Sequence, residues 1–228
     1  MMNMVIESFP NPCTATKEGI LALGGDLDPE TLLLAYRNGI FPWPIEGLPL
    51  AWFCPPRRAI LEFSGLHVPR SLARARARSP FSFTMDTAFD EVIRACADTP
   101  RPGQPGTWIT QEMLLAYSQL HELGFAHSVE AWDGTELVGG IYGVSVDGIF
   151  AGESMFFRKS PASKLALLHL IDFLQANGLS WMDIQVMTPH MRTLGAKLIS
   201  RDQFLKSLKQ TRSLGLNLFP TAAAPHAP

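Results

Sequence analysis

The sequence predicts an α+β protein, in which a small N-terminal α+β domain (residues 1–62) precedes a larger domain (residues 63–228) with a mixed, mainly antiparallel sheet flanked by helices. Three observations lead to this prediction. The first part of the chain is dense in Pro, Gly and aromatic residues, whereas regular alternating and helical patterns begin near residue 81. Two Asp-Gly pairs, at 133–134 and 147–148, separate apolar segments as hairpin turns do. A hydrophobic share of 46% with 18% charged residues indicates a folded chain with a substantial core.

In the small domain the clearest element is a helix that begins after Asp28, a residue type that caps helix N-termini, with Pro29 in the first helical position. Gly39 supplies the left-handed residue that ends this helix. LAWFCPP, residues 50–56, is expected to be an edge strand because two prolines end it. Residues 63–80 are expected to form a basic junction between the domains.

The larger domain has a regular order of elements. A strand and two helices come first, a three-stranded meander follows, and a helix and a strand complete the order. Residues 220–228, at the end of the chain, are expected to be a disordered tail. The expected ranges are 81–85 (strand), 87–98 and 111–124 (helices), 126–132, 136–146 and 148–157 (meander), 162–177 (helix) and 181–186 (strand).

This order is that of the GNAT acyltransferase fold, a likeness of fold that does not settle function. Enzymes of that fold that use acetyl-CoA place a glycine-rich loop before the helix that follows the meander, so that backbone N–H groups bind the pyrophosphate. Here the loop reads RKSPAS, with Pro161 and Ser163 where glycines are expected, and proline has no N–H. A GNAT-type N-acyltransferase that uses acyl-CoA is therefore a weaker alternative.

The arginines are concentrated in one segment. The net charge is −2, yet residues 57–85 contain six arginines (57, 58, 70, 74, 76 and 78) against one acid, Glu62. A basic patch of this kind commonly binds phosphate. Arg70, Arg74 and Arg78 lie four residues apart and share a stripe if the segment is helical, and Arg76 lies off it. A solvated charged face is the ordinary interpretation, and a non-catalytic RNA-binding module is a second rival function.

Several classes of protein are disfavoured by composition. The three cysteines lie far apart, which argues against a disulfide framework or a zinc knuckle, and the six histidines lack metal-ligand spacing. No apolar run approaches the ~18 residues of a membrane span, and the N-terminus does not resemble an export signal. We therefore expect a cytoplasmic protein without a cofactor, a metal or a membrane partner.

The stretch WMDIQV, Trp181 to Val186, has the apolar character of a buried strand but carries two polar residues. Side chains alternate along a strand, so Asp183 and Gln185 are expected on one face. A buried carboxylate must be paired, neutralised or part of a site. From these residues alone, a structural role and a functional role are about equally supported.

Nine short motifs together resemble a known family. ILALGGDL, YRNGIFPW, TWIT, LHELGFAHSVEAW, LVGGIYGV, GESMFFR, ASK-AL, D-x-QV and LGA occur in the order and spacing of leucyl/phenylalanyl-tRNA–protein transferases, from about residue 9 to residue 205. The resemblance implies a bacterial cytoplasmic enzyme of the N-degron pathway with a GNAT-like C-terminal domain. Such an enzyme moves Leu or Phe, with Met as a further candidate, from its tRNA to proteins with N-terminal Lys or Arg. No cofactor is implied, and we expect a monomer.

The resemblance also implies catalytic residues. Asp183 and Gln185 match the pair to which the family's proton handling is assigned. In one account Asp183 bonds to the amide of Gln185 and orients it toward the attacking amine. In the other, a ribose hydroxyl of the tRNA carries the proton and Gln185 only positions. Glu153 is the third catalytic candidate, as an anion that holds the amine or the cationic side chain of the acceptor.

Binding residues are implied in the same way. Trp43 and Trp108 are expected where the terminal adenosine of the tRNA stacks, and the arginines at 70, 74, 76 and 78 are expected to bind tRNA phosphates. Core packing is the ordinary interpretation of any of the apolar residues. The pocket for the aminoacyl side chain is expected to be lined by Ile141, Phe150, Leu170, Leu174 and Met182.

Overall fold

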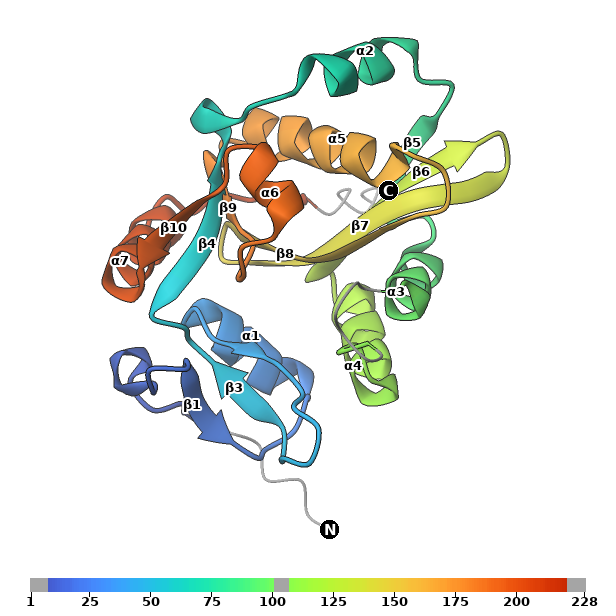
Figure 1. Cartoon of the computed structure of the whole chain (residues 1–228). Helices are drawn as coiled ribbons and strands as arrows, with labels where there is room; N and C mark the ends of the chain where they lie inside the picture. Colours follow the sequence, from blue (N-terminus) through green and yellow to red (C-terminus); the bar gives the residue numbers. More distant parts are fainter. Residues whose placement is uncertain (1–7, 101–106, 221–228) are drawn as a thin grey trace, which may run out of the picture.

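The structure is a computed structural model of the chain that describes residues 8–100 and 107–220 (Figure 1). The 3-10 helix η1 (Pro12–Thr14) precedes an antiparallel sheet in the order β1 (Ile20–Leu23), β3 (Ala51–Phe53), β2 (Phe41–Pro42). β3 is the middle strand, so the expectation of an edge strand is wrong. The prolines at 55 and 56 follow the end of β3 and therefore remove no donor from the ladder.

Helix α1 (Pro29–Arg37) begins and ends as predicted. Pro29 lies in the first turn, and Gly39 has a φ of +72° just after the last turn. Asp28 is the N-cap residue, but its side chain makes no capping hydrogen bond. The carboxylate of Asp26 instead accepts from the Asp28 N–H at 3.1 Å and from the Thr31 hydroxyl at 2.9 Å. The start of the helix is thus held from two residues further upstream than expected.

The larger sheet has seven strands in the order β10-β4-β9-β8-β7-β6-β5. Every neighbouring pair is antiparallel except β8 and β9, which run parallel. This arrangement confirms the expected mixed, mainly antiparallel sheet. The strands are β4 (Arg57–Glu62), β5 (Ser82–Met85), β6 (Ala126–Asp133), β7 (Glu136–Val146), β8 (Ile149–Phe157), β9 (Trp181–Asp183) and β10 (Lys197–Ser200).

Helices cover both faces of this sheet (Figure 1). On one face α5 (Ala162–Ala176) packs against apolar side chains of β6 to β9, and α2 (Arg70–Arg78) lies beside it. On the other face α3 (Phe89–Asp98) and α4 (Gln111–Glu122) share a core with the N-terminal part. α6 (Pro189–Thr193), α7 (Arg201–Arg212), the 3-10 helix η2 (Phe63–Gly65) and β10 were not predicted. No helix within the described residues is long and apolar enough to cross a membrane.

The meander turns follow from their sequences. Between β7 and β8, Asp147 and Gly148 have φ values of +50° and +77°, the two positive angles that a type I′ turn requires. Between β6 and β7, Gly134 has a φ of +61°. Both predicted hairpins are confirmed.

The position of β4 links the two parts of the chain. This strand lies within the range expected for the small domain, yet it pairs with β9 and β10 of the larger sheet. It therefore carries residues from the N-terminal part directly into the centre of the site described next. The tail expected at 220–228 lies outside the described residues, apart from residue 220.

Candidate active site

A sharp turn follows strand β9. The expected strand through Val186 is wrong, because β9 ends at Asp183. The N–H of Val186 donates to the carbonyl of Ile184 at 2.5 Å, which closes a three-residue turn centred on Gln185. Gln185 has a φ of +51°, a conformation that costs a residue other than glycine roughly 1–3 kcal/mol. Strained residues of this kind cluster at functional sites, so the turn supports Gln185 as a candidate active-site residue.

A buried ion pair supports this turn. The Nε and Nη2 atoms of Arg58, on β4, donate to the two carboxylate oxygens of Asp183 at 2.8 and 2.6 Å. The two residues are only 1% and 3% exposed. The guanidinium carbon also lies 4.4 Å from the ring centroid of Phe41 and 4.5 Å from that of Phe204. Assigning Arg58 to an exposed basic patch is therefore wrong; this arginine neutralises Asp183 in the core.

Burial is the largest single influence on the pKa of Arg58, but the charge and the hydrogen bonds of Asp183, with smaller contributions from Cys54 and Glu153, together outweigh it. Burial by itself would lower the pKa of Arg58, but the neighbouring carboxylate raises it above its ordinary value. Arg58 therefore keeps its charge and holds Asp183 from both oxygens. A bidentate pair of this kind fixes orientation as well as charge.

The contacts between Asp183 and Gln185 differ from those expected. Asp183 accepts a hydrogen bond from the backbone N–H of Gln185 at 2.9 Å, which holds the turn. The side-chain amide of Gln185 donates to Oε1 of Glu153 at 2.7 Å, so it is bonded to Glu153 where a bond to Asp183 was expected. Asp183 therefore orients Gln185 through its backbone.

Glu153 reaches this position through a β-bulge. Tyr142 of β7 pairs with Ser154, and Gly143 pairs with Gly152, so Glu153 is an extra residue in β8. Bulges redirect side chains and are frequent beside active sites. The carboxylate of Glu153 also accepts hydrogen bonds from the hydroxyls of two tyrosines on α1 and α4. The distances are 2.9 Å from Tyr36 and 3.5 Å from Tyr117, and the two hydroxyl oxygens are 2.5 Å apart.

The surroundings of Glu153 change its acidity. Burial raises the pKa of Glu153 from 4.5 to about 8, against the opposing effect of the hydrogen bond from Tyr36; the charge of Asp183 raises it further. Burial also raises the pKa values of Tyr36 and Tyr117 well above 10, so both phenols keep their protons at neutral pH. Glu153 is thus a carboxyl group that gains and loses its proton near neutral pH.

Sequence profiles of one family match most of the chain. The profile described as leucyl/phenylalanyl-tRNA protein transferase matches residues 60–209, and that of the N-terminal domain of the same family matches residues 25–56. The leucyl/phenylalanyl-tRNA–protein transferase of Oleidesulfovibrio alaskensis is 49% identical over 91% of this chain and 86% of its own length. That of Flavobacterium psychrophilum is 48% identical over 89% and 96%.

The chain belongs to the leucyl/phenylalanyl-tRNA protein transferase family. It is therefore an aminoacyltransferase, and the family resemblance inferred from the nine motifs is confirmed. Among solved structures, L-PGS from Bacillus licheniformis is similar at a TM-score of 0.39 and 17% identity, over 71% of this chain and 52% of that one. A similarity this weak carries no functional inference.

The five apolar residues expected to line a pocket in this transferase belong to a single cluster on the α5 face of the sheet. Each is at most 5% exposed, so they pack as core in this structure. Gly152 makes room for one of them, since a Cβ at this position would lie 2.7 Å from Cε of Met182. Met182 directly precedes Asp183 in β9, so the two side chains point to opposite faces of the sheet and the cluster lies across β9 from the ion pair. Its members are Ile141, Phe150, Leu170, Leu174 and Met182.

The two expected tryptophans come together from distant segments. The rings of Trp43 and Trp108 are stacked, with centroids 5.2 Å apart and an angle of 12° between planes. Both are partly buried against the core of the N-terminal part. They form a joint aromatic surface, as a base-stacking site requires.

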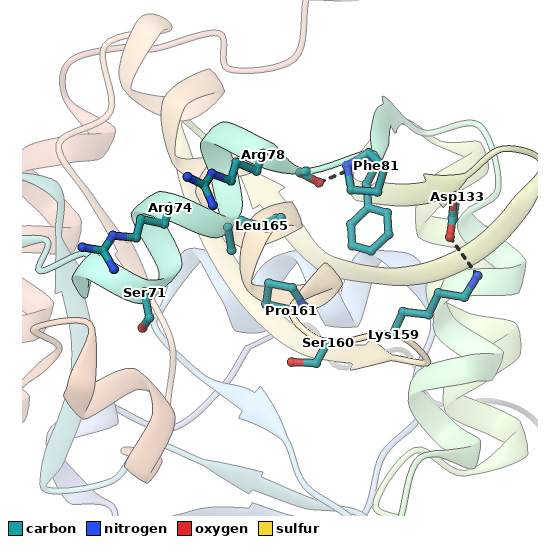
Figure 2. Close-up of a pocket in the computed structure, with 12 residues that line it drawn as sticks. Ser71, Arg74, Arg78, Phe81, Asp133, Lys159, Ser160, Pro161 and Leu165 are labelled. Carbon is teal, nitrogen blue, oxygen red and sulfur yellow. Dashed lines mark hydrogen bonds and ion pairs between the residues drawn. The ribbon is translucent and has the colours of Figure 1, made fainter.

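The segment that carries Arg70, Arg74, Arg76 and Arg78 forms helix α2, the condition under which a stripe was expected. Arg74 and Arg78 line an open cavity of about 610 Å³ between α2 and the start of α5, with Lys159 and Ser160 on its other side (Figure 2). We call Arg70, Arg74 and Arg78 the arginine stripe. Arg76, which lies off this stripe, forms an ion pair with Asp172 of α5.

Three residues of the site were missed from the sequence. Tyr36 and Tyr117 were predicted only as parts of helices, and Arg58 was counted with the basic patch. A signal for Arg58 was present, because an arginine inside the apolar strand sequence RRAILE demands a buried partner. The tyrosines gave no such signal, since buried tyrosines commonly serve packing alone.

Proposed function

We propose that this transferase moves Leu or Phe, with Met as a third candidate, from its tRNA to the α-amine of proteins that begin with Lys or Arg. The observation that carries the proposal is the hydrogen-bonded pair of Glu153 and Gln185, which stands beside the buried ion pair of Arg58 and Asp183. Membership of the family supports the aminoacyl-tRNA as donor. We propose that the three residues expected from the sequence form this site: Asp183, Gln185 and Glu153.

The chemistry requires orientation and proton transfer. Aminoacyl-tRNA is an ester, and forming an amide from it runs downhill, so the reaction needs no ATP. The enzyme must bring the amine to the carbonyl carbon and manage one proton. The anionic form of Glu153 would attract the positive charge of an N-terminal Lys or Arg, which favours these acceptors over neutral ones.

The aminoacyl-tRNA donor would contact the protein in three places. We propose that Trp43 and Trp108 stack with the terminal adenosine, a contact worth ~1–3 kcal/mol per base. The two indoles stack on each other, so the adenine would stack against an outer face of the pair. The aminoacyl side chain would enter the apolar cluster beside Met182, whose packing must open for it. The arginine stripe would bind phosphates of the acceptor stem.

In the cell, we propose that the protein acts in the cytoplasm, where aminoacyl-tRNA is present, and works as a monomer. Adding Leu or Phe to a protein's N-terminus would mark that protein for degradation by the N-degron pathway. The transferase would in this way determine which proteins are degraded.

The direct test supplies the protein with radiolabelled Phe-tRNA and a folded acceptor with N-terminal Arg, without ATP. A matched acceptor with N-terminal Ala is the control for selectivity. We expect label on the Arg acceptor at least tenfold above the Ala acceptor. Uptake only from a labelled acyl-CoA would overturn the proposal in favour of an N-acyltransferase, and tRNA binding without transfer would favour an RNA-binding module.

A further inference from the structure

We propose that Glu153 is the group that accepts the proton of the attacking α-amine and returns it to the ribose oxygen, and that Asp183 and Arg58 are positioning residues that hold Gln185. This inference rests on the proposed function. It differs from both accounts that the family resemblance implies, in which Gln185 with Asp183, or a ribose hydroxyl of the tRNA, handles the proton.

Asp183 is poorly placed to take a proton. Both of its oxygens accept hydrogen bonds from Arg58, and one accepts a further bond from the backbone of Gln185. Protonating Asp183 would leave the Arg58 guanidinium charged and unpaired between the rings of Phe41 and Phe204. Removing one charge of a buried pair typically costs ~3–5 kcal/mol. The pair therefore acts as a fixed support.

Gln185 is not a base either. A carboxamide takes up a proton only in strong acid, and the amide nitrogen of Gln185 already donates to Glu153. This bond leaves the carbonyl oxygen of Gln185 as the atom that can accept from an incoming amine. Gln185 would therefore bind and orient the amine next to Glu153.

Protonation of Glu153 leaves no other charged group without its partner. The groups that contact its carboxylate are neutral: the hydroxyl of Tyr36 from α1, the hydroxyl of Tyr117 from α4 and the amide of Gln185. The charged groups that act on it are Arg58 of β4 and Asp183 of β9, which neutralise each other. As a whole residue Glu153 is only partly buried, so the site lies close enough to the surface for a substrate to approach.

The acidity of Glu153 fits this role. Its pKa of about 8, raised chiefly by burial, is close to the ~7.7–8.0 of an α-amino group. A base is most effective when its pKa lies near the working pH.

The proposed step is balanced. The neutral α-amine attacks the ester carbonyl, a C–N bond forms, and Glu153 takes one proton from the nitrogen. The C–O bond to the ribose then breaks, and protonated Glu153 gives its proton to the leaving oxygen. The products are the amide and the free ribose hydroxyl, and Glu153 is again a carboxylate.

The pH dependence of kcat/KM for the acceptor tests this assignment, with saturating Phe-tRNA. In the wild type both the amine and Glu153 must lose a proton, so below about pH 7 the rate should rise about a hundredfold per pH unit. In Glu153→Gln only the amine titrates, and the rise should be about tenfold per unit. The substitution should also lower kcat by about 10²–10⁴-fold.

A second variant keeps the assignment testable if Glu153→Gln fails to fold. The hydrogen bond from Tyr36 lowers the pKa of Glu153, so Tyr36→Phe should move the Glu153 step to higher pH while keeping the steep rise. A tenfold rise in the wild type, or a hundredfold rise retained in Glu153→Gln, would overturn the assignment, as would an unshifted profile in Tyr36→Phe. Failure of the wild type to transfer at all would instead refute the proposed function.

Discussion

Breaking the ion pair between Arg58 and Asp183 should destabilise the whole protein. In Asp183→Ala, Arg58 stays charged and buried with no acid at its guanidinium; in Arg58→Met, the buried carboxylate loses both donors. Because the two residues are 1% and 3% exposed, water cannot replace the lost partner without opening the core. We therefore expect each single substitution to lower the free energy of unfolding by about 3–5 kcal/mol.

This loss is large compared with the total stability of a domain, which is typically ~5–15 kcal/mol. For a chain of this size each kcal/mol lowers Tm by about 2–4 °C, so each single variant should melt about 6–20 °C below the wild type. Thermal unfolding followed by circular dichroism measures this shift. Urea unfolding supplies the free energy itself.

The double variant Arg58→Met/Asp183→Leu separates the pair's two roles. Replacing both charges by apolar side chains of similar size is often neutral for stability, so the double variant should recover most of the loss. Its transfer activity should stay at least tenfold low, because the backbone N–H of Gln185 has lost its acceptor. Singles that melt within about 2 °C of the wild type, or a double variant whose loss equals the sum of the singles, would refute this reasoning.

Three further predictions concern substrate binding and the turn. Replacing the three residues of the arginine stripe by Ala should flatten the slope of log K against log[salt] for tRNA binding by about 2–3 units. The control is Arg76→Ala, which should change the slope by less than one because Arg76 is already paired with Asp172. Equal effects of the two replacements would contradict this prediction. Leu174→Phe should shift preference from Phe toward smaller side chains by ~1–3 kcal/mol, and an unchanged ratio in a competition assay would assign Leu174 to packing alone. Gln185→Gly should be at least as stable as Gln185→Ala, since glycine adopts the φ of +51° without strain. Both variants should lower transfer tenfold or more, with tRNA binding in a filter-binding assay unchanged. Near-wild-type turnover in both would remove Gln185 from the site.

The sequence alone determined the order and the ends of most elements. The side chain of Thr110 caps α4 by accepting from the N–H of Met113, Pro29 opens α1, and Asp147 with Gly148 forms the type I′ turn. Each of these features depends on residues only a few positions apart, so local preferences suffice to predict it. The nine motifs and their order were likewise enough to assign the family.

Which arginine is buried was decided by the tertiary structure. Arg57 and Arg58 are the same residue type at adjacent positions, yet Arg57 is exposed and Arg58 is buried. The difference arises because β4 inserts between β10 and β9, which turns Arg58 toward the carboxylate of a residue 125 positions away. No local pattern contains that information.

The same holds for the catalytic centre. Alternation along WMDIQV predicted Asp183 and Gln185 on one face of a strand, but the strand ends at Asp183 and the chain turns back on itself, so the two residues are joined through the backbone of Gln185. The turn exists because Asp183, held by Arg58, accepts from the backbone of Gln185, and because Glu153, moved out of register by a bulge, receives the amide. Tyr36 and Tyr117 reach the same carboxylate from two other helices. Residue types and spacing identified the candidates, whereas their partners, and hence their charges and roles, depend on packing between segments far apart in the chain.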